Sequence, residues 1–118
     1  MLLVTIGGSV LKRYNLPVCP VETTLVMVGD RWKILIVRNL LTGTKRFGEL
    51  RKGLDGISQK VLTDHLRIME ENGIVNRKVY AEVPPKLEYS LTPLGKSLKP
   101  IHDAMWEWGE KFQKKASK

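Results

Sequence analysis

Residues 57–73 constrain the fold of this chain more than any other part of the sequence. Their apolar residues recur at helical spacing, because residues three or four apart share one face of a helix. Ser58 is suited to cap the first turn, and Gly73 to adopt the left-handed conformation that ends many helices. The stretch therefore predicts one amphipathic helix. Its inner face carries Leu62, Leu66 and Met69, and its outer face carries Lys60, Thr63, Asp64, Arg67 and Glu71.

The residues before this stretch predict three more helices. A proline at the first helical position starts one helix at Cys19-Pro20, and Asp30 can cap a second over residues 32–41. The apolar run at 34–37 would also suit a strand, but the length of the segment and its cap favour a helix. Residues 47–54 predict a short third helix with its apolar side turned inward.

An ordinary amphipathic surface helix would also satisfy the pattern at 57–73, so its neighbours decide the interpretation. A short helix, a glycine turn and a longer capped helix follow one another in helix-turn-helix order over residues 46–72. After Gly73 the apolar period changes to two, which predicts a hairpin over 75–91 with prolines at its exposed bend. This order defines a winged helix-turn-helix. The predicted fold class is mainly α with a small β-hairpin and flanking dimerisation helices, in a single domain over 1–118.

The two ends of the chain differ in how strongly they are patterned. Residues 1–18 predict an N-terminal arm, in which 2–6 suits either a short strand or a loose segment. Residues 92–113 predict a C-terminal helix with an apolar stripe at steps of four and three, and with a kink or break at Pro100. The stripe favours pairing with a second copy, although covering the chain's own core would also explain it. Its residues are Leu94, Leu98, Ile101, Met105, Trp108 and Phe112, broadened by Trp106.

The charge balance favours a polyanionic partner. The chain holds 20 Lys and Arg against 12 Asp and Glu in 118 residues, and its formal net charge is +8. Nucleic acid and an anionic membrane surface both suit this charge, but no apolar run approaches the roughly 18 residues of a membrane span. The single cysteine, Cys19, excludes an internal disulfide, and residues 1–6 are a poor secretion signal. We therefore expect a cytoplasmic protein.

Five motifs occur in order over about residues 14–112. They are Cys19-Pro20-Val21-Glu22, Gly29-Asp30-Arg31-Trp32-Lys33, Arg46-Phe47-Gly48-Glu49-Leu50, Ile57-Ser58-Gln59-Lys60-Val61-Leu62, and Glu82-Val83-Pro84-Pro85-Lys86 with Glu88-Tyr89-Ser90-Leu91-Thr92. Together they resemble the HxlR-type winged-helix transcription regulators, relatives of the MarR group. The resemblance implies a homodimeric bacterial or archaeal regulator that binds double-stranded operator DNA, with the helix at 58–72 in the major groove. The chain departs from the pattern at His65, and residues 1–11 lie outside it.

The outer face of the expected recognition helix carries side chains that can bind or read DNA. Gln59 can pair with adenine, and Thr63 can touch a thymine methyl group. Lys60 and Arg67 can reach guanine or phosphate, while Ser58 and the backbone N–H groups of the first turn suit a phosphate. Basic residues of the wing are candidate contacts to the DNA backbone or minor groove, unless they are simply solvated. The wing candidates are Arg77, Lys78 and Lys86.

Cys19 is a candidate site of a different kind. Its place at a helix N-terminus, and cations such as Arg13 or Arg31 if the fold brings them close, would favour the thiolate. In proteins similar to this one, a cysteine at this Cys-Pro position senses oxidants or electrophiles. Oxidation of a lone cysteine would give a bridge between two subunits, a mixed disulfide or an adduct. The alternative is a buried, inert thiol.

Residue patterns for catalysis or metal binding are missing from the sequence. His65 and His102 are isolated and lack metal-ligand spacing, and there is neither a glycine-rich phosphate loop nor a nucleophile–base arrangement. We therefore expect no enzyme, no metal and no cofactor, but a sequence-specific DNA-binding regulator. Two alternatives stay open. One is a regulator gated by a small-molecule inducer at the dimer interface among Trp32, Trp106 and Trp108, and the other is a winged-helix protein-interaction module.

Overall fold

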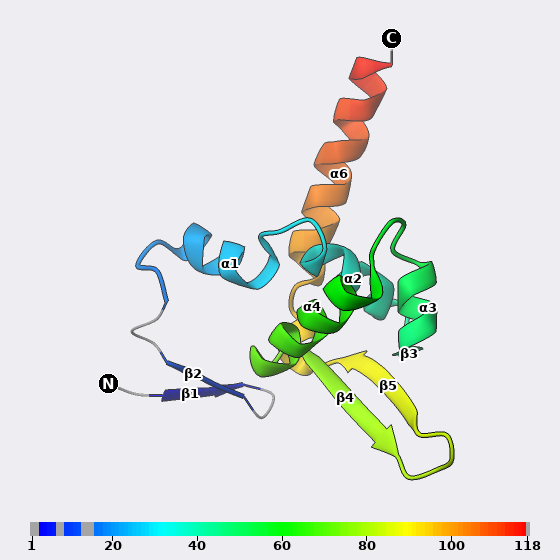
Figure 1. Ribbon diagram of the computed structural model, residues 1–118. Coiled ribbons are helices and arrows are strands. Elements are labelled where there is room, and N and C mark those ends of the chain that lie inside the picture. Colours follow the sequence, from blue (N-terminus) through cyan, green and yellow to red (C-terminus); the bar gives the residue numbers. More distant parts are fainter. Residues whose placement is uncertain (1–2, 7–8, 13–15, 118) are drawn as a thin grey trace.

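The computed structural model describes residues 3–6, 9–12 and 16–117, and its elements follow the predicted order (Figure 1). The helices are α1 (Pro20–Val28), α2 (Lys33–Leu41), α3 (Phe47–Lys52), α4 (Gln59–Glu71), α5 (Pro93–Lys96) and α6 (Lys99–Ala116). The strands are β1 (Leu3–Ile6), β2 (Ser9–Lys12), β3 (Lys45–Arg46), β4 (Val75–Tyr80) and β5 (Lys86–Leu91). The expected fold class, a mainly helical winged helix-turn-helix with a small antiparallel sheet, is confirmed.

Side-chain oxygens satisfy backbone N–H groups at the starts of α2 and α4. Asp30 Oδ1 accepts hydrogen bonds from the backbone N–H of Trp32 at 2.8 Å and of Lys33 at 2.9 Å. Ser58 Oγ accepts one from the backbone N–H of Val61 at 3.1 Å. The first N–H groups of a helix have no partner within it, so such caps fix where the helix begins. Both caps were predicted from the sequence.

The end of α4 is a tight turn that directs the chain into the wing. Gly73 has a φ of 76°, in the left-handed region. Its N–H donates to the Glu70 carbonyl at 3.0 Å, and the N–H of Ile74 donates to the Met69 carbonyl at 2.9 Å. These two bonds form a Schellman motif. The buried hydroxyl of Thr92 donates to the Gly73 carbonyl and ties this turn to the start of α5.

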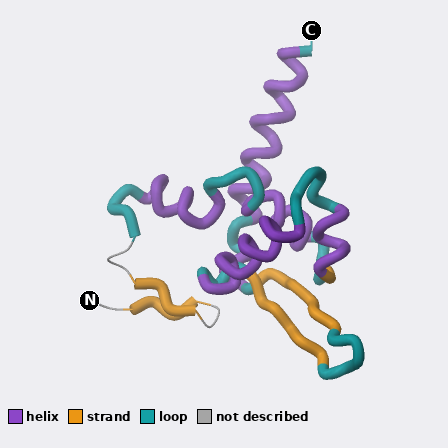
Figure 2. Tube along the Cα trace, in the orientation of Figure 1, coloured by secondary structure: helices purple, strands orange, loops and turns teal. Residues whose placement is uncertain are grey.

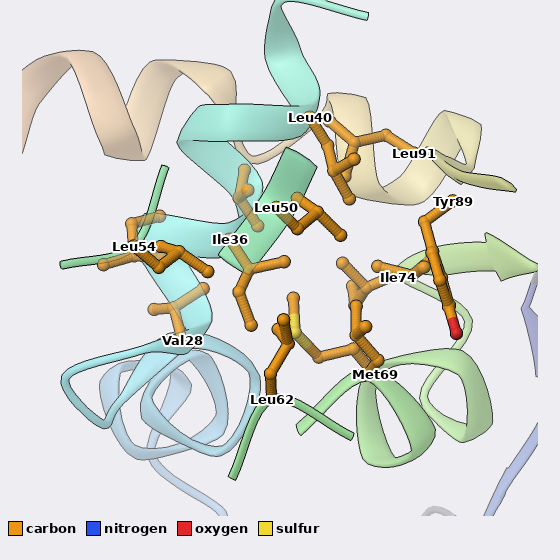
Figure 3. Close-up of a cluster of buried hydrophobic side chains, with 14 of the residues drawn as sticks. Val28, Ile36, Leu40, Leu50, Leu54, Leu62, Met69, Ile74, Tyr89 and Leu91 are labelled. Carbon is orange, nitrogen blue, oxygen red and sulfur yellow. The ribbon is translucent and has the colours of Figure 1, made fainter. Parts of the chain in front are cut away.

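One cluster of buried apolar side chains holds the helix-turn-helix to the sheet (Figure 3). Ile36 from α2 and Leu50 from α3 lie in it, both fully withdrawn from solvent. Leu62, Leu66 and Met69, the predicted inner face of α4, are buried in the same cluster. Full burial of a side chain of this size contributes about 1.5–3 kcal/mol relative to its exposure. The cluster therefore determines which side of α4 faces outward.

The wing has one more strand than the sequence predicted. β4 and β5 pair antiparallel, with Val75 opposite Leu91 and Tyr80 opposite Lys86, as expected for a hairpin. The two-residue strand β3 pairs with the other edge of β5, so the order in this sheet is β3-β5-β4. A strand this short has no alternating pattern of its own, which explains why the sequence analysis missed it.

The two ends of the chain also have regular structure. The C-terminal segment forms two helices, because α5 ends at Lys96 and α6 begins at Lys99 with Pro100 in its first turn. The break predicted at this proline is confirmed and lies just before it, where a proline costs no helical hydrogen bond. α6 projects away from the winged helix (Figure 2). β1 pairs with β2, so the strand alternative holds for the described part of residues 2–6.

Among the helices of the described ranges, none combines the length and apolar character needed to span a membrane.

Replacing Gly73 by alanine tests the turn that ends α4. Alanine in the left-handed region is strained by roughly 1–2 kcal/mol, so we expect Gly73→Ala to lower the free energy of unfolding by about this amount. Gly48→Ala is the control, because a Cβ there meets no atom within 4 Å. Gly48 lies inside α3, where alanine has the higher helix propensity, so this variant should raise the free energy by up to about 1 kcal/mol. Urea unfolding measures the free energy of unfolding of the wild type and both variants. A change in the same direction for both variants would contradict the prediction.

Candidate nucleic-acid interface

α4 lies beside β4 of the wing (Figure 1), and its outer face carries the predicted contact residues. Gln59, Lys60, Thr63 and Arg67 are all exposed, and the side chains of Lys60 and Arg67 are 84% and 65% exposed. The buried apolar cluster holds the opposite side of the same helix. The structure thus places these four predicted contact residues together on one free surface.

A carboxylate lies between the two cations of this surface. Lys60 Nζ is 2.8 Å from Asp64 Oδ2, and Arg67 Nη1 is 4.0 Å from Asp64 Oδ1. The hydrogen bond from Lys60 lowers the pKa of Asp64, and the charges of Lys60, Arg67 and His65 add to this effect against a smaller opposing one from burial. Asp64 therefore stays ionised at neutral pH and holds both cations along the helix. Exposed pairs of this kind are weak, so an incoming phosphate can replace the carboxylate.

Two polar side chains at the start of α4 are engaged with its backbone. Ser58 serves as the cap described above, and the Thr63 hydroxyl donates to the Gln59 carbonyl at 2.8 Å. The Thr63 oxygen keeps lone pairs that can accept a further hydrogen bond. The backbone N–H groups of the first turn lie at the positive end of the helix dipole, which favours an anion.

The structure divides the three predicted wing residues between two faces of the hairpin. Directly opposed residues of an antiparallel pair share a face, and Arg77 lies opposite Tyr89. Arg77 Nε is 3.4 Å from Glu70 Oε1 of α4, so Arg77 joins the wing to this helix. Both residues line a cleft between α4 and the wing, together with Thr63, Leu66, Arg67 and Tyr89. Burial raises the pKa of Tyr89, which keeps its hydroxyl neutral beside Arg77.

Lys78 and Lys86 lie on the other face of the hairpin, around one aromatic ring. Their Nζ atoms are 4.9 and 4.8 Å from the centroid of the Tyr80 ring. The Tyr80 hydroxyl donates to Glu88 Oε1 at 2.8 Å, and Lys86 Nζ is 3.4 Å from Glu88 Oε2. This hydrogen bond from Tyr80 lowers the pKa of Glu88, and Lys86 lowers it further. Both lysines are therefore held in a cation–π and ion-pair cluster rather than free in solvent.

Arg46 is a basic residue of this face that the sequence analysis did not select. It lies in β3 directly opposite Glu88, so it shares the face of Lys78 and Lys86, and its charge also lowers the pKa of Glu88. Its exposed side chain adds a further cation to the wing. Only the pairing of β3 with β5 brings it there, and the Arg46-Phe47-Gly48 motif gave no sign of that pairing.

Cys19 is an exposed free thiol at the N-cap of α1. Its carbonyl accepts from the backbone N–H of Thr23 at 3.0 Å, which begins the helix as predicted. Of the two expected cations, Arg13 lies outside the described residues. Arg31 stacks on Trp32, with its Cζ 4.3 Å from the ring centroid. The alternative of a buried thiol does not hold for this chain.

The histidines and tryptophans each have defined surroundings. His65 is largely covered and is hydrogen-bonded to the Val61 carbonyl and to Asp30. Within the described ranges, no group of three His, Cys, Asp or Glu side chains could hold a metal ion. A mostly apolar hollow between α2 and α6 is lined by Trp106 but not by Trp32 or Trp108, so it does not join the three tryptophans. It is lined by Ile34, Leu35, Arg38, His102, Met105 and Trp106.

The fold is a winged helix-turn-helix, and comparison with known proteins defines its class as a transcriptional regulator of HxlR and MarR type. The profile of one family, described as HxlR-like helix-turn-helix, matches residues 27–117. The chain belongs to this family.

Individual relatives agree with this assignment. The chain is 47% identical over 100 residues to the uncharacterised HTH-type transcriptional regulator YdeP of Bacillus subtilis (strain 168), covering 85% of this chain and 78% of YdeP. Among solved structures it is similar to the redox regulator HypR. The oxidised form of HypR is 49% identical with a TM-score of 0.75, and the match covers 79% of this chain and 96% of HypR. The reduced form is 47% identical with a TM-score of 0.78, and covers 80% and 94%.

Proposed function

We propose that this regulator binds operator DNA with α4 in the major groove. The observation that carries the proposal is the single exposed face of α4, on which Gln59, Lys60, Thr63 and Arg67 lie together. This face is opposite the buried cluster, so the fold presents it to a partner rather than to its own core. The major groove admits an α-helix, and these side-chain types suit base edges and phosphates.

The position of each side chain on α4 indicates which part of the DNA it would contact. Gln59 lies at the N-terminal end, which approaches the bases most closely in helix-turn-helix proteins, and it is suited to adenine. Ser58 and the first-turn N–H groups are suited to a phosphate. Lys60 and Arg67 would leave their ion pairs with Asp64 and bind guanine or phosphate instead. Each bidentate base contact is worth about 1–3 kcal/mol of discrimination.

The wing supplies backbone contacts in this proposal. Arg77 lies beside α4 and can reach a phosphate next to the major groove. Lys78, Lys86 and the additional Arg46 form the other basic face, where DNA would compete with Glu88 for them. These contacts would add affinity and salt dependence rather than sequence preference.

We further propose that the protein is a homodimer paired through α6. Trp108 is 70% exposed and Phe112 is 56% exposed in the single chain, and their rings stack with centroids 5.5 Å apart. Met105 extends this exposed apolar surface along α6, and the exposed Trp106 lies next to Met105 on its flank. Large exposed apolar patches mark interfaces, and a second copy would cover this one. The two recognition helices would then address half-sites one helical turn apart, about 34–36 Å.

Cys19 is proposed as the sensor of oxidants or electrophiles. It is an exposed free thiol at the N-cap of α1, where an oxidant can reach it. The similar protein HypR is a redox regulator, which supports a redox role for this chain. A small-molecule inducer in the hollow between α2 and α6 is the second candidate, favoured by the mostly apolar lining beside Arg38.

The DNA-binding face is tested with Arg67→Ala. We expect it to weaken binding to a DNA fragment from the promoter next to its own gene by about fivefold to 100-fold, because it removes a base or phosphate contact. Lys114→Ala is the control, since it removes one positive charge from the far end of α6. A fluorescence anisotropy titration at two salt concentrations measures both. Binding that is salt-dependent but indifferent to sequence would favour a general electrostatic or protein-interaction role.

The dimer is tested with Trp108→Glu. A carboxylate in the centre of the α6 stripe would be buried without a partner, so we expect the variant to be a 13.4 kDa monomer at micromolar concentration. Lys114→Glu changes the charge on the opposite side of the same helix and should leave the dimer intact. Sedimentation velocity gives the mass of each. A wild-type chain that sediments as a monomer would refute pairing through α6.

The sensor role is tested with Cys19→Ser and diamide. Diamide should change the operator affinity of the wild type, and dithiothreitol should restore it. The serine variant has no thiol within reach of the oxidant, because Cys19 is the single cysteine, so its affinity should stay constant. Non-reducing electrophoresis shows whether the product is a Cys19–Cys19 bridge. An equal response of the two proteins to diamide would remove Cys19 from the mechanism.

A further inference from the structure

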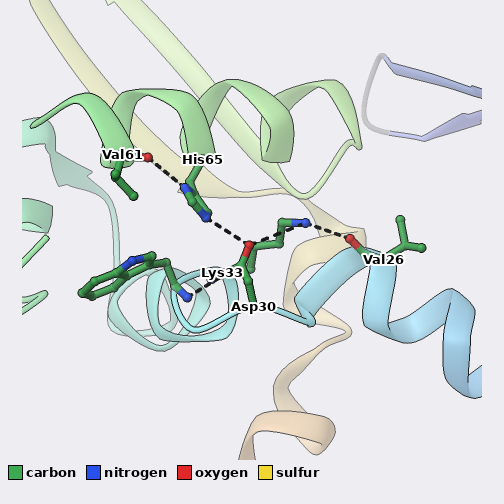
Figure 4. A network of polar contacts seen from close by, with 6 residues as sticks. Val26, Asp30, Lys33, Val61 and His65 are labelled. Atoms are coloured by element: carbon green, nitrogen blue, oxygen red, sulfur yellow. Dashed lines mark hydrogen bonds and ion pairs between the residues drawn. The ribbon is translucent and has the colours of Figure 1, made fainter. Parts of the chain in front are cut away.

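The ring of His65 lies between two acceptor oxygens, one on its own helix and one on the turn between α1 and α2 (Figure 4). Nδ1 is 2.8 Å from the Val61 carbonyl oxygen, and Nε2 is 3.0 Å from Asp30 Oδ2. The His65 side chain is 19% exposed, so water reaches it only in part. Asp30 and His65 are 35 residues apart in sequence, and this contact joins α4 directly to the N-terminal cap of α2.

Both partners of the ring accept hydrogen bonds and neither can donate one while Asp30 is ionised. A neutral imidazole carries one N–H and can satisfy one of them. The imidazolium carries two and satisfies both. The contact is therefore complete only when the ring is protonated. Histidine is the side-chain type whose charge can change between about pH 5 and 8.

The groups around the ring keep Asp30 in the ionised form. Partial burial, the largest single influence, raises the pKa of Asp30, but the backbone N–H groups of Lys33 and Trp32 and the His65 ring lower it, and the net pKa is below its ordinary value. Lys33 Nζ is also 3.9 Å from Asp30 Oδ2 and donates to the Val26 carbonyl at 3.0 Å. Asp30 is therefore a carboxylate at neutral pH.

The charges that face His65 are of both signs. Asp30 contacts it from the α1–α2 turn, Lys33 flanks Asp30 from the start of α2, and Asp64 precedes it on α4. Asp64 is itself paired with Lys60 and Arg67 on the outer face. The ring thus lies between the cap of α2 and the charged surface of the recognition helix.

We propose that His65 is a positioning residue for DNA binding: as the imidazolium it holds α4 against the α1–α2 turn, and loss of its proton loosens this contact. The inference rests on the proposed role of α4 as the recognition helix. Thr63 and Arg67 are two residues from His65 on the same helix, so a small rotation of α4 changes their approach to the bases. Operator affinity should therefore fall as the pH rises from 6 to 8.

The first experiment uses the protein without DNA. Backbone amide shifts of residues 31–33 and 59–67 are followed by NMR from pH 5.5 to 8.0 in the wild type, His65→Gln and Asp30→Asn. We expect a common titration step in the wild type that is lost in His65→Gln. In Asp30→Asn the amide oxygen can still cap α2 and the NH₂ group can donate to a neutral ring, so the step should shrink there too. His102→Gln is the matched control, because His102 also lies 3.0 Å from an aspartate but on α6; it should keep the step.

The second experiment measures affinity for the promoter fragment at pH 6 and pH 8 at constant salt. We expect the wild type and His102→Gln to lose about threefold to tenfold in affinity over this range, which is the size of effect that one ordinary hydrogen bond contributes. His65→Gln and Asp30→Asn should change by less than about twofold. A mutation that merely damaged the fold would lower affinity equally at both pH values.

The outcomes separate this inference from the proposed function. An identical NMR titration of residues 59–67 in the wild type and His65→Gln would overturn it, whatever the protein binds. A second result would also refute the proposed role of His65. In it, the amide shifts of α4 change with pH and this change is lost in His65→Gln, but the promoter affinity of the wild type depends on pH no more than that of His65→Gln. If no variant binds the promoter fragment at any pH, the proposed DNA binding fails, while the NMR result still decides whether His65 positions α4.

Discussion

α4 packs one side against the apolar cluster that it shares with α2, α3 and the sheet, through Leu62, Leu66 and Met69. At about 1.5–3 kcal/mol for each buried side chain, these three contribute several kcal/mol, which is comparable with the net stability of a whole small domain. α4 therefore cannot leave the cluster without unfolding the chain. Its outer face is exposed as a consequence of what its inner face buries, and the wing and the cap of α2 are placed relative to it.

The parts of this arrangement that depend on neighbouring residues were predictable from the sequence. Ser58, Gly73 and Asp30 act within three or four residues of their own positions, so the limits of α2 and α4 follow from local patterns. The exposed face of α4 followed from helical periodicity alone. β3, and with it the place of Arg46 opposite Glu88, depends on pairing between distant segments. The contact of His65 with Asp30 depends in the same way on how two helices pack, which a single sequence does not contain. The opposite faces of Arg77 and Lys78, in contrast, follow from their adjacent positions in one strand.

The charge of the surface is more finely balanced than the net charge of +8 suggests. Lys60 and Arg67 share Asp64, Arg77 lies against Glu70, and Lys86 lies against Glu88. These exposed pairs are weak, so they restrict the long basic side chains only in part before any anion arrives. A phosphate would replace a carboxylate at each place. The affinity would therefore depend on the difference in free energy between the cation–carboxylate pair and the cation–phosphate pair, and this difference is sensitive to salt and geometry.

Two kinds of contact thus determine where α4 lies. The apolar cluster sets its depth and its exposed side, but dispersion and hydrophobic contacts are non-directional and tolerate a small rotation or sliding of the helix. Hydrogen bonds are directional, and they anchor α4 at the Schellman turn around Gly73 and at His65. The anchor at Gly73 uses backbone groups that do not titrate. The anchor at His65 joins two ionisable side chains, so protonation of the ring can adjust the orientation of α4 while the buried cluster and the fold stay unchanged.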